Sequence, residues 1–170
     1  MSRFKRIKQP EGSPLCAAAV AAMICGTSIE DFQKLWKHEG PYSDTEVVIY
    51  CWRHGWQMGG MGFNVPRTLK IVDDHVLSCR WSFQGSPAYL GVKSRNYPDI
   101  SHAVLWDGQF VLDPDPKTPE KTCIEDYDVE QVFPLYEMPY LIARRIKWNF
   151  TPDEFMEFEG ASFAEETSTI

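Results

Sequence analysis

The chain has 170 residues, of which 44% are hydrophobic and 14% aromatic, a composition typical of a folded globular domain rather than a disordered chain. Its formal net charge is −7, from 17 basic and 24 acidic residues, which argues against a nucleic-acid-binding surface. No run approaches the roughly 18 uninterrupted apolar residues of a membrane span. No apolar core follows the basic start of the chain, so this start is not a secretory signal.

The domain organisation follows from length, cysteine content and the composition of the tail. We expect one domain over residues 1–158 and a mobile acidic tail over 159–170. The cysteines are odd in number and form no dense framework, which favours reduced thiols and a cytoplasmic location. They are Cys16, Cys25, Cys51, Cys79 and Cys123. Oligomeric state stays open.

The first third of the chain predicts three helices. Ser13 and Pro14 are typical of an N-cap and a first helical position, so we expect an apolar, buried helix that runs through Cys25. The segments 27–30 and 43–46 each match a capping box, which predicts two further helices.

The rest of the chain favours strands, so the overall expectation is an α+β fold with N-terminal helices packed on an antiparallel sheet. Residues 88–93 and the hairpin 102–113 are the clearest strands, and 140–148 is a further one, whereas 76–83 is ambiguous. The remaining expected segments are a glycine-rich loop over 58–63, a short helix over 66–73 and a C-terminal helix from Thr151.

The hairpin gives a specific contact. Asp107-Gly108, between two alternating apolar runs, is a strong signal for a two-residue type I′ turn. In that register Trp106 pairs with Gln109, and His102 falls directly opposite Asp113. The turn therefore predicts an imidazole held by a carboxylate, the arrangement that orients a catalytic histidine.

The hairpin has two faces with different expected environments. His102, Val104, Val111 and Asp113 share one face, which we expect to look toward the helix or a cleft. The opposite face looks like core and consists of Ala103, Leu105, Phe110 and Leu112.

Cys16 is a candidate nucleophile. With Ser13 as N-cap it is the third helical residue, where free N–H groups and the helix dipole stabilise a thiolate. The alternative is a small buried cysteine packed among alanines. The predicted pair of His102 and Asp113 favours the catalytic interpretation, because buried charged pairs away from a site are uncommon.

Gln9 lies seven positions before Cys16, just outside the helix. Its amide could join the Cys16 N–H as an oxyanion donor, or it could be a solvated side chain of an N-terminal arm. The same arm carries Arg3, Lys5, Arg6 and Lys8, which we expect to be solvated.

These residues carry a resemblance. The segments QPEGSPLCAAAVAAMICGTSIEDF, PAYLGV and HAVLWDGQFVLDPDP resemble the papain-like cysteine peptidases, and are most similar to the C39-like group of bacteriocin leader-processing peptidases. The resemblance spans about residues 9–116 and implies catalytic roles for Gln9, Cys16, His102 and Asp113. This chain has Ala17 where many members have Gly, and its Gln-to-Cys interval is one residue longer than the common pattern.

The expected function is a cysteine hydrolase, chiefly a peptidase acting on a peptide or protein substrate through a thioester, with no cofactor or metal. Segments 59–62 and 94–101 are candidate cleft walls. One alternative keeps the triad but changes the reaction to that of an amidase, deamidase, transglutaminase or acyltransferase. Another is a catalytically silent papain-like module that binds a protein partner as an inhibitor.

A zinc site is a weaker alternative. The spacing of Cys51, His54, His75 and Cys79 fits four ligands. However, Cys51 completes the apolar face of its expected helix, and His54 suits the negative C-terminal end of that helix.

Overall fold

The computed structural model describes residues 3–59, 86–95 and 100–138. Several expected segments lie outside the described residues: the helices over 66–73 and from Thr151, the ambiguous segment 76–83, the strand over 140–148, the tail 159–170 and most of the glycine-rich loop. In the described parts, no helix is long and apolar enough to cross a membrane.

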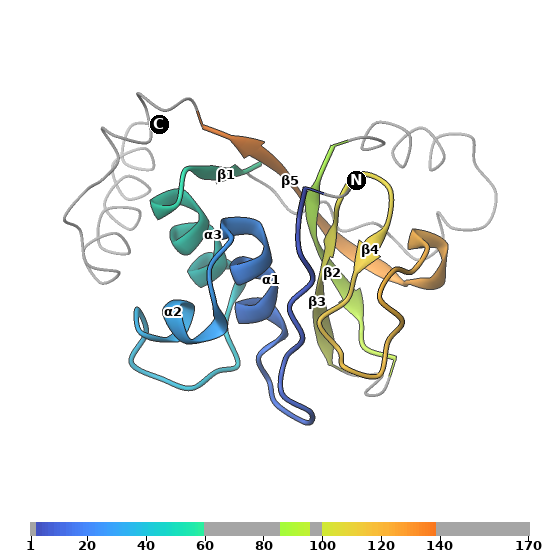
Figure 1. The fold of residues 1–170 in the computed structure, drawn as a ribbon, viewed down its shortest axis with the longest axis horizontal. Helices are drawn as coiled ribbons and strands as arrows, with labels where there is room; N and C mark the ends of the chain where they lie inside the picture. The colour runs from blue at the N-terminus through green and yellow to red at the C-terminus, as the bar shows by residue number, and fades with distance from the viewer. Residues whose placement is uncertain (1–2, 60–85, 96–99, 139–170) are drawn as a thin grey trace, which may run out of the picture.

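The described chain is an α+β fold, as expected, with an open antiparallel sheet of five strands in the order β1-β5-β2-β3-β4. The helices gather on one side of this sheet, and α1 packs on β3 (Figure 1). The elements are α1 (Cys16–Cys25), α2 (Ile29–Gln33), α3 (Asp44–Arg53), β1 (Trp56–Met58), β2 (Ala88–Lys93), β3 (Ser101–Trp106), β4 (Val111–Leu112), a 3-10 turn (Ile124–Asp126) and β5 (Val129–Glu137).

The capping pattern of α3 is confirmed, whereas that of α1 is wrong. The Ser43 hydroxyl accepts the Glu46 N–H, and the Glu46 carboxylate accepts the Ser43 N–H, which is a complete capping box. The Ser13 hydroxyl instead donates to the Pro10 carbonyl at 2.7 Å. Leu15 is the N-cap of α1, so Cys16 is the first helical residue rather than the third.

The second helix begins one residue later than expected. Ser28, not Thr27, is its N-cap, and the Ser28 hydroxyl accepts the Asp31 N–H. The helix ends at Gln33.

The hairpin register is wrong by two residues. Leu105 pairs with Leu112, so four residues form the connection instead of two. The reason is the Asp107 side chain, which accepts the N–H groups of Gln109 and Phe110 at 2.8 and 2.7 Å and thereby closes a longer turn. A two-residue slip keeps every side chain on its face. Asp113 is therefore a diagonal neighbour of His102 rather than its direct partner.

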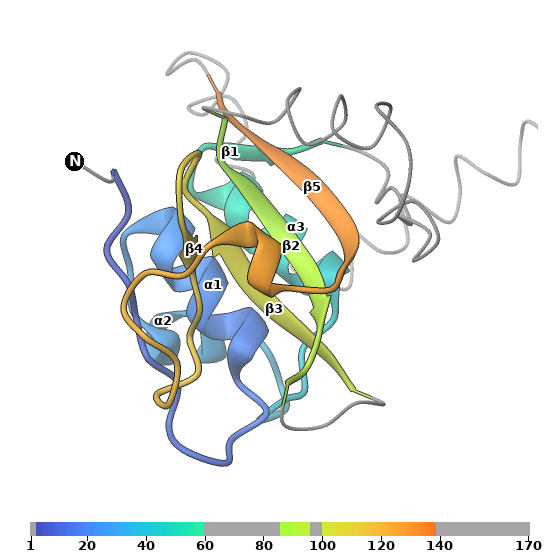
Figure 2. The same cartoon turned by 90° about the vertical axis from the view of Figure 1, so that its right-hand side faces the viewer.

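Ala103, Leu105 and Leu112 lie in a core, as expected, but the expectation that the opposite face of the hairpin looks toward the helix is wrong. The face with Ala103 and Leu105 packs against α1 in the main core. Val104 and Val111, on the His102 face, form a second core with Tyr127 on the opposite side of the sheet. The chain after β4 crosses that side of the sheet, as Figure 2 shows, and this segment is why the second face is buried.

Two strands were not expected. β1 is short, and β5 contains Pro134, which argues against a central strand because proline has no N–H to donate. β5 nevertheless lies between β1 and β2. Pro134 lies beside the residue that follows β1, because β1 ends at Met58 and Gly59 donates its N–H to the Pro134 carbonyl at 2.7 Å. The missing N–H of Pro134 therefore removes no hydrogen bond from within β1.

The two serines give a direct test of the helix starts. We expect Ser43→Ala to lower the free energy of unfolding by about 1 kcal/mol, because it removes a helix cap. Ser13→Ala, the matched control, should lower it by clearly less, since the Ser13 hydroxyl bonds in an exposed turn. Urea unfolding measures both. An equal loss in the two variants would contradict the assigned start of α1.

Candidate active site

Three elements bring Cys16, His102 and Asp113 together. Cys16 begins α1, His102 is the second residue of β3, and Asp113 directly follows β4. His102 Nε2 lies 2.7 Å from Asp113 Oδ1, and the two side chains are 14% and 3% exposed. The contact between imidazole and carboxylate therefore exists, although its register differs from the expected one.

The Cys16 thiol contacts the other side of this pair. Burial acts to raise the pKa of Cys16, but a hydrogen bond from the His102 ring and the charge of that ring outweigh it, so the pKa lies below its ordinary value. Backbone hydrogen bonds at Ala17 and Ala103 lower the pKa further. His102 above all, with these backbone groups, thus favours the thiolate of Cys16, the form that attacks carbon.

His102 and Asp113 stabilise each other's charged forms. Burial acts to lower the pKa of His102, but the hydrogen bonds with Asp113 and Cys16 raise it to about 9. Burial likewise acts to raise the pKa of Asp113, and the bond and charge of His102 reverse the direction. At neutral pH the His102 ring is therefore an imidazolium. It lies between the Asp113 carboxylate and the Cys16 thiol, whose lowered pKa favours the thiolate.

Asp113 accepts hydrogen bonds at both carboxylate oxygens. Oδ1 accepts the Asp115 N–H at 2.8 Å in addition to His102. Oδ2 accepts the hydroxyls of Tyr127 at 2.8 Å and Thr118 at 3.2 Å. Four donors thus hold one buried negative charge, which explains how Asp113 stays ionised at 2% exposure.

Arg6 supports the loop that holds Asp113, a role that was not expected from the sequence. Its guanidinium donates to the backbone carbonyls of Asp113, Asp115 and Thr118, the last two at 2.6 and 2.9 Å. The interpretation of the arm as solvated is therefore wrong at Arg6, whereas Lys5 is exposed. A guanidinium offers five donors in a planar fork, so one side chain can bind several carbonyls of the same loop. Nothing local in the sequence separates Arg6 from its basic neighbours.

Gln9 lies in the same cavity as Cys16 and His102. Its Nε2 donates to the Ser13 carbonyl at 2.9 Å, and its backbone N–H donates to the Pro114 carbonyl. Within the described residues, the buried Oε1 has no hydrogen-bond partner. An amide nitrogen has two hydrogens, so Ser13 leaves one for a ligand in the cavity.

The cavity over Cys16 has a volume of about 630 Å³. One wall comes from the expected segment 94–101, through Ser94, Ile100 and Ser101. The other wall comes from the loops that hold Glu11 and Lys117, whose side chains form an ion pair at 2.8 Å. Most of the other expected wall, 59–62, lies outside the described residues.

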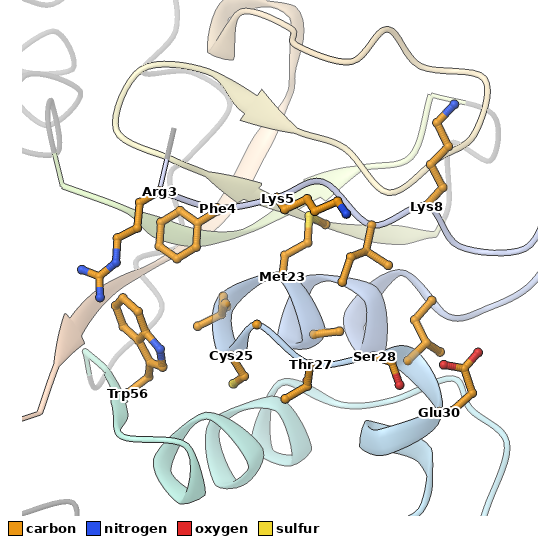
Figure 3. Close-up of a pocket in the computed structure, with 15 residues that line it drawn as sticks. Arg3, Phe4, Lys5, Lys8, Met23, Cys25, Thr27, Ser28, Glu30 and Trp56 are labelled. Atoms are coloured by element: carbon orange, nitrogen blue, oxygen red, sulfur yellow. The ribbon is translucent and has the colours of Figure 1, made fainter. Parts of the chain in front are cut away.

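A larger cavity, of about 740 Å³, lies at the opposite end of α1. The N-terminal arm from Arg3 to Lys8, Met23 and Trp56 surround it (Figure 3). It contains the Cys25 thiol, whose pKa is raised by a hydrogen bond with Cys51 and by burial. A thiol of that kind is a poor nucleophile, so we assign the active site to the smaller cavity.

The zinc alternative gains no support among the described residues, where no group of three or more metal-ligating side chains occurs. Cys51 is buried, with its Sγ 3.9 Å from that of Cys25, and His54 Nδ1 bonds to the Tyr50 carbonyl. The other two expected ligands, His75 and Cys79, lie outside the described residues.

Comparison of the chain with protein-family models, with curated proteins and with solved structures found no match. The roles of these residues therefore rest on their own geometry and chemistry.

Selective alkylation tests the assignment of the thiols. At pH 6–7 we expect iodoacetamide to label Cys16 much faster than Cys25, because their pKa values are shifted in opposite directions. The Cys16 rate should fall as pH drops through its lowered pKa, and His102→Ala should move that fall to higher pH. Peptide mapping by mass spectrometry measures each site. Equal, slow labelling of both cysteines would rule out an activated thiol.

Proposed function

We propose that this protein is a papain-like cysteine hydrolase that cleaves peptide bonds. The observation that carries the proposal is the arrangement of a thiol at a helix start, an imidazole and a buried carboxylate, open to a cavity of about 630 Å³. A helix with the nucleophile, packed on an antiparallel sheet with the histidine, also supports the papain-like comparison. The choice of peptide bonds rests on the resemblance to the leader-processing peptidases.

The chemistry follows from the protonation states. The Cys16 thiolate attacks the substrate carbonyl carbon, and the carbonyl oxygen becomes an oxyanion near the Cys16 N–H and the Gln9 amide. The His102 imidazolium then gives its proton to the departing amine as the carbon–nitrogen bond breaks, which leaves a thioester. Water attacks the thioester while His102 takes its proton, the acid product leaves, and Cys16 returns to the thiolate.

Asp113 keeps the ring in one orientation throughout this cycle. Its Oδ1 bonds to Nε2 and thereby directs the other ring nitrogen, Nδ1, to the thiol side. The raised pKa of His102 favours the imidazolium that the first step consumes.

The same triad supports other acyl transfers. Replacing water by an amine gives transglutaminase or acyltransferase chemistry, and a glutamine side chain as substrate gives deamidation, because all of these reactions pass through a thioester. A silent binding module is the further alternative, and the lowered pKa of Cys16 argues against it.

The products formed in a host lysate distinguish these reactions. We expect the wild type, and not Cys16→Ala, to generate new peptide termini, which mass spectrometry detects. New amide cross-links or deamidated glutamines in place of cleavage would transfer the proposal to the alternative reactions. Identical lysates after the two treatments, together with slow labelling of Cys16, would leave the binding module.

Gln9 allows a test that separates an oxyanion donor from a structural residue. We expect Gln9→Ala to lower kcat by about 100-fold, as the loss of one oxyanion donor does in proteases. Alkylation of Cys16 by iodoacetamide forms no oxyanion, so its rate should stay unchanged. A fall in both kcat and the alkylation rate would mean that Gln9 supports the fold around Cys16, not the reaction.

A further inference from the structure

Tyr127 contacts Asp113 but does not line the cavity over Cys16. It follows the 3-10 turn and packs in the second core beside Val104 and Val111, with 2% of its surface exposed. Its hydroxyl is 2.8 Å from Asp113 Oδ2 and 2.9 Å from Thr122 Oγ1. A residue placed only to fill this core would have no need of the hydroxyl.

The direction of these hydrogen bonds is fixed by counting protons. An ionised carboxylate only accepts, and Tyr127 has one hydroxyl hydrogen, so Tyr127 donates it to Asp113. Thr122 then directs its own hydrogen to the Tyr127 oxygen or to the Val111 carbonyl, 3.3 Å away. Thr122 thus leaves the tyrosine hydrogen for the carboxylate.

The surroundings of Tyr127 favour the protonated hydroxyl. Burial raises the pKa of Tyr127 above its ordinary value, and the negative charge of Asp113 adds to the shift. The guanidinium of Arg95 lies over the ring, 4.4 Å from its centre, and holds it from the solvent side.

We propose that Tyr127 is a positioning residue for the pair of Cys16 and His102, because its hydroxyl fixes the plane of the Asp113 carboxylate and so directs Oδ1 to the imidazole. This inference rests on the proposed cysteine hydrolase function. His102 and the backbone N–H of Asp115 both bind Oδ1. Hydrogen bonds to this one oxygen leave the carboxylate plane free to rotate. Of the two hydrogen bonds to Oδ2, the one from Tyr127 is shorter, at 2.8 Å, than the one from Thr118, at 3.2 Å.

Other charged groups also lie near His102, and Tyr127→Phe alters none of them chemically. Cys16 approaches the ring from α1, and Asp113 approaches it from the end of β4. A small cavity of about 180 Å³ that His102 also lines is bordered by Lys93, Arg95, Asp115 and Lys117. A change in the pKa of His102 on removal of the Tyr127 hydroxyl therefore reports on the hydroxyl itself.

The test is Tyr127→Phe, which keeps the ring and removes the hydroxyl. We expect the pKa of His102, followed by NMR of its ring protons, to fall from about 9 toward 6.5, because the carboxylate no longer stays directed at the imidazolium. Alkylation of Cys16 at pH 6 should slow about tenfold, the effect of one charge-assisted hydrogen bond. With a peptide substrate, kcat should fall and KM should not change.

Tyr50→Phe is the matched control. Tyr50 is equally buried at 3% exposure, and its hydroxyl bonds to Thr27 Oγ1 at 2.9 Å near the opposite end of α1. It should leave the pKa of His102 and the alkylation rate of Cys16 unchanged. Thr118→Val removes the longer donor to the same carboxylate oxygen, and we expect a smaller shift in the same direction.

The outcomes separate the two proposals. A folded Tyr127→Phe variant with an unchanged pKa of His102 and an unchanged alkylation rate overturns the positioning role. If circular dichroism shows that Tyr127→Phe is unfolded, Thr118→Val decides, and an unchanged pKa there overturns the role as well. Slow labelling of Cys16 in the wild type overturns the proposed hydrolase instead, whereas the NMR measurement needs no substrate.

Discussion

A carboxylate that is removed from water is strongly unfavourable unless donors occupy its oxygens, and Asp113 satisfies this requirement with four. Each donor belongs to a different part of the chain: β3, the turn after β4, the loop that follows it, and the segment after the 3-10 turn. Arg6 adds the N-terminal arm, because it binds the Asp113 carbonyl. Asp113 therefore connects the arm through its backbone carbonyl and the other four parts through its carboxylate, and that carboxylate also holds the His102 ring.

Features encoded within a few residues could be predicted from the sequence. The α3 capping box and the bounds of β2 agree with the structure, since each depends on neighbours in the chain. Ser13 shows the limit of such patterns, because its hydroxyl has a competing acceptor three residues earlier, at Pro10. The contact of His102 with Asp113 was predicted from a register that is wrong by two, and it exists because a slip of two keeps both side chains on one face.

Features that depend on distant partners could not be predicted. Pro134 argues against a central strand until the place where β1 ends is known. Arg6 looks like its basic neighbours, and its acceptors lie more than a hundred positions away. Tyr127 looks like any aromatic core residue until its hydroxyl is seen against Asp113. At the candidate site, Cys16 and His102 have local signals in the sequence, whereas the groups that hold Asp113 do not.

The position of β5 bears on how the protein is made. This strand comes last in the described chain, yet it lies between β1 and β2 and follows directly on Tyr127 and its bond to Asp113. At roughly 5–20 residues per second, a ribosome adds β5 about six seconds or more after Cys16. During that interval the two parts of the sheet have no strand to join them, and Asp113 lacks a donor. The sheet and the full set of donors to Asp113 are therefore completed only when the last part of the described chain has been made, well after Cys16 and its helix.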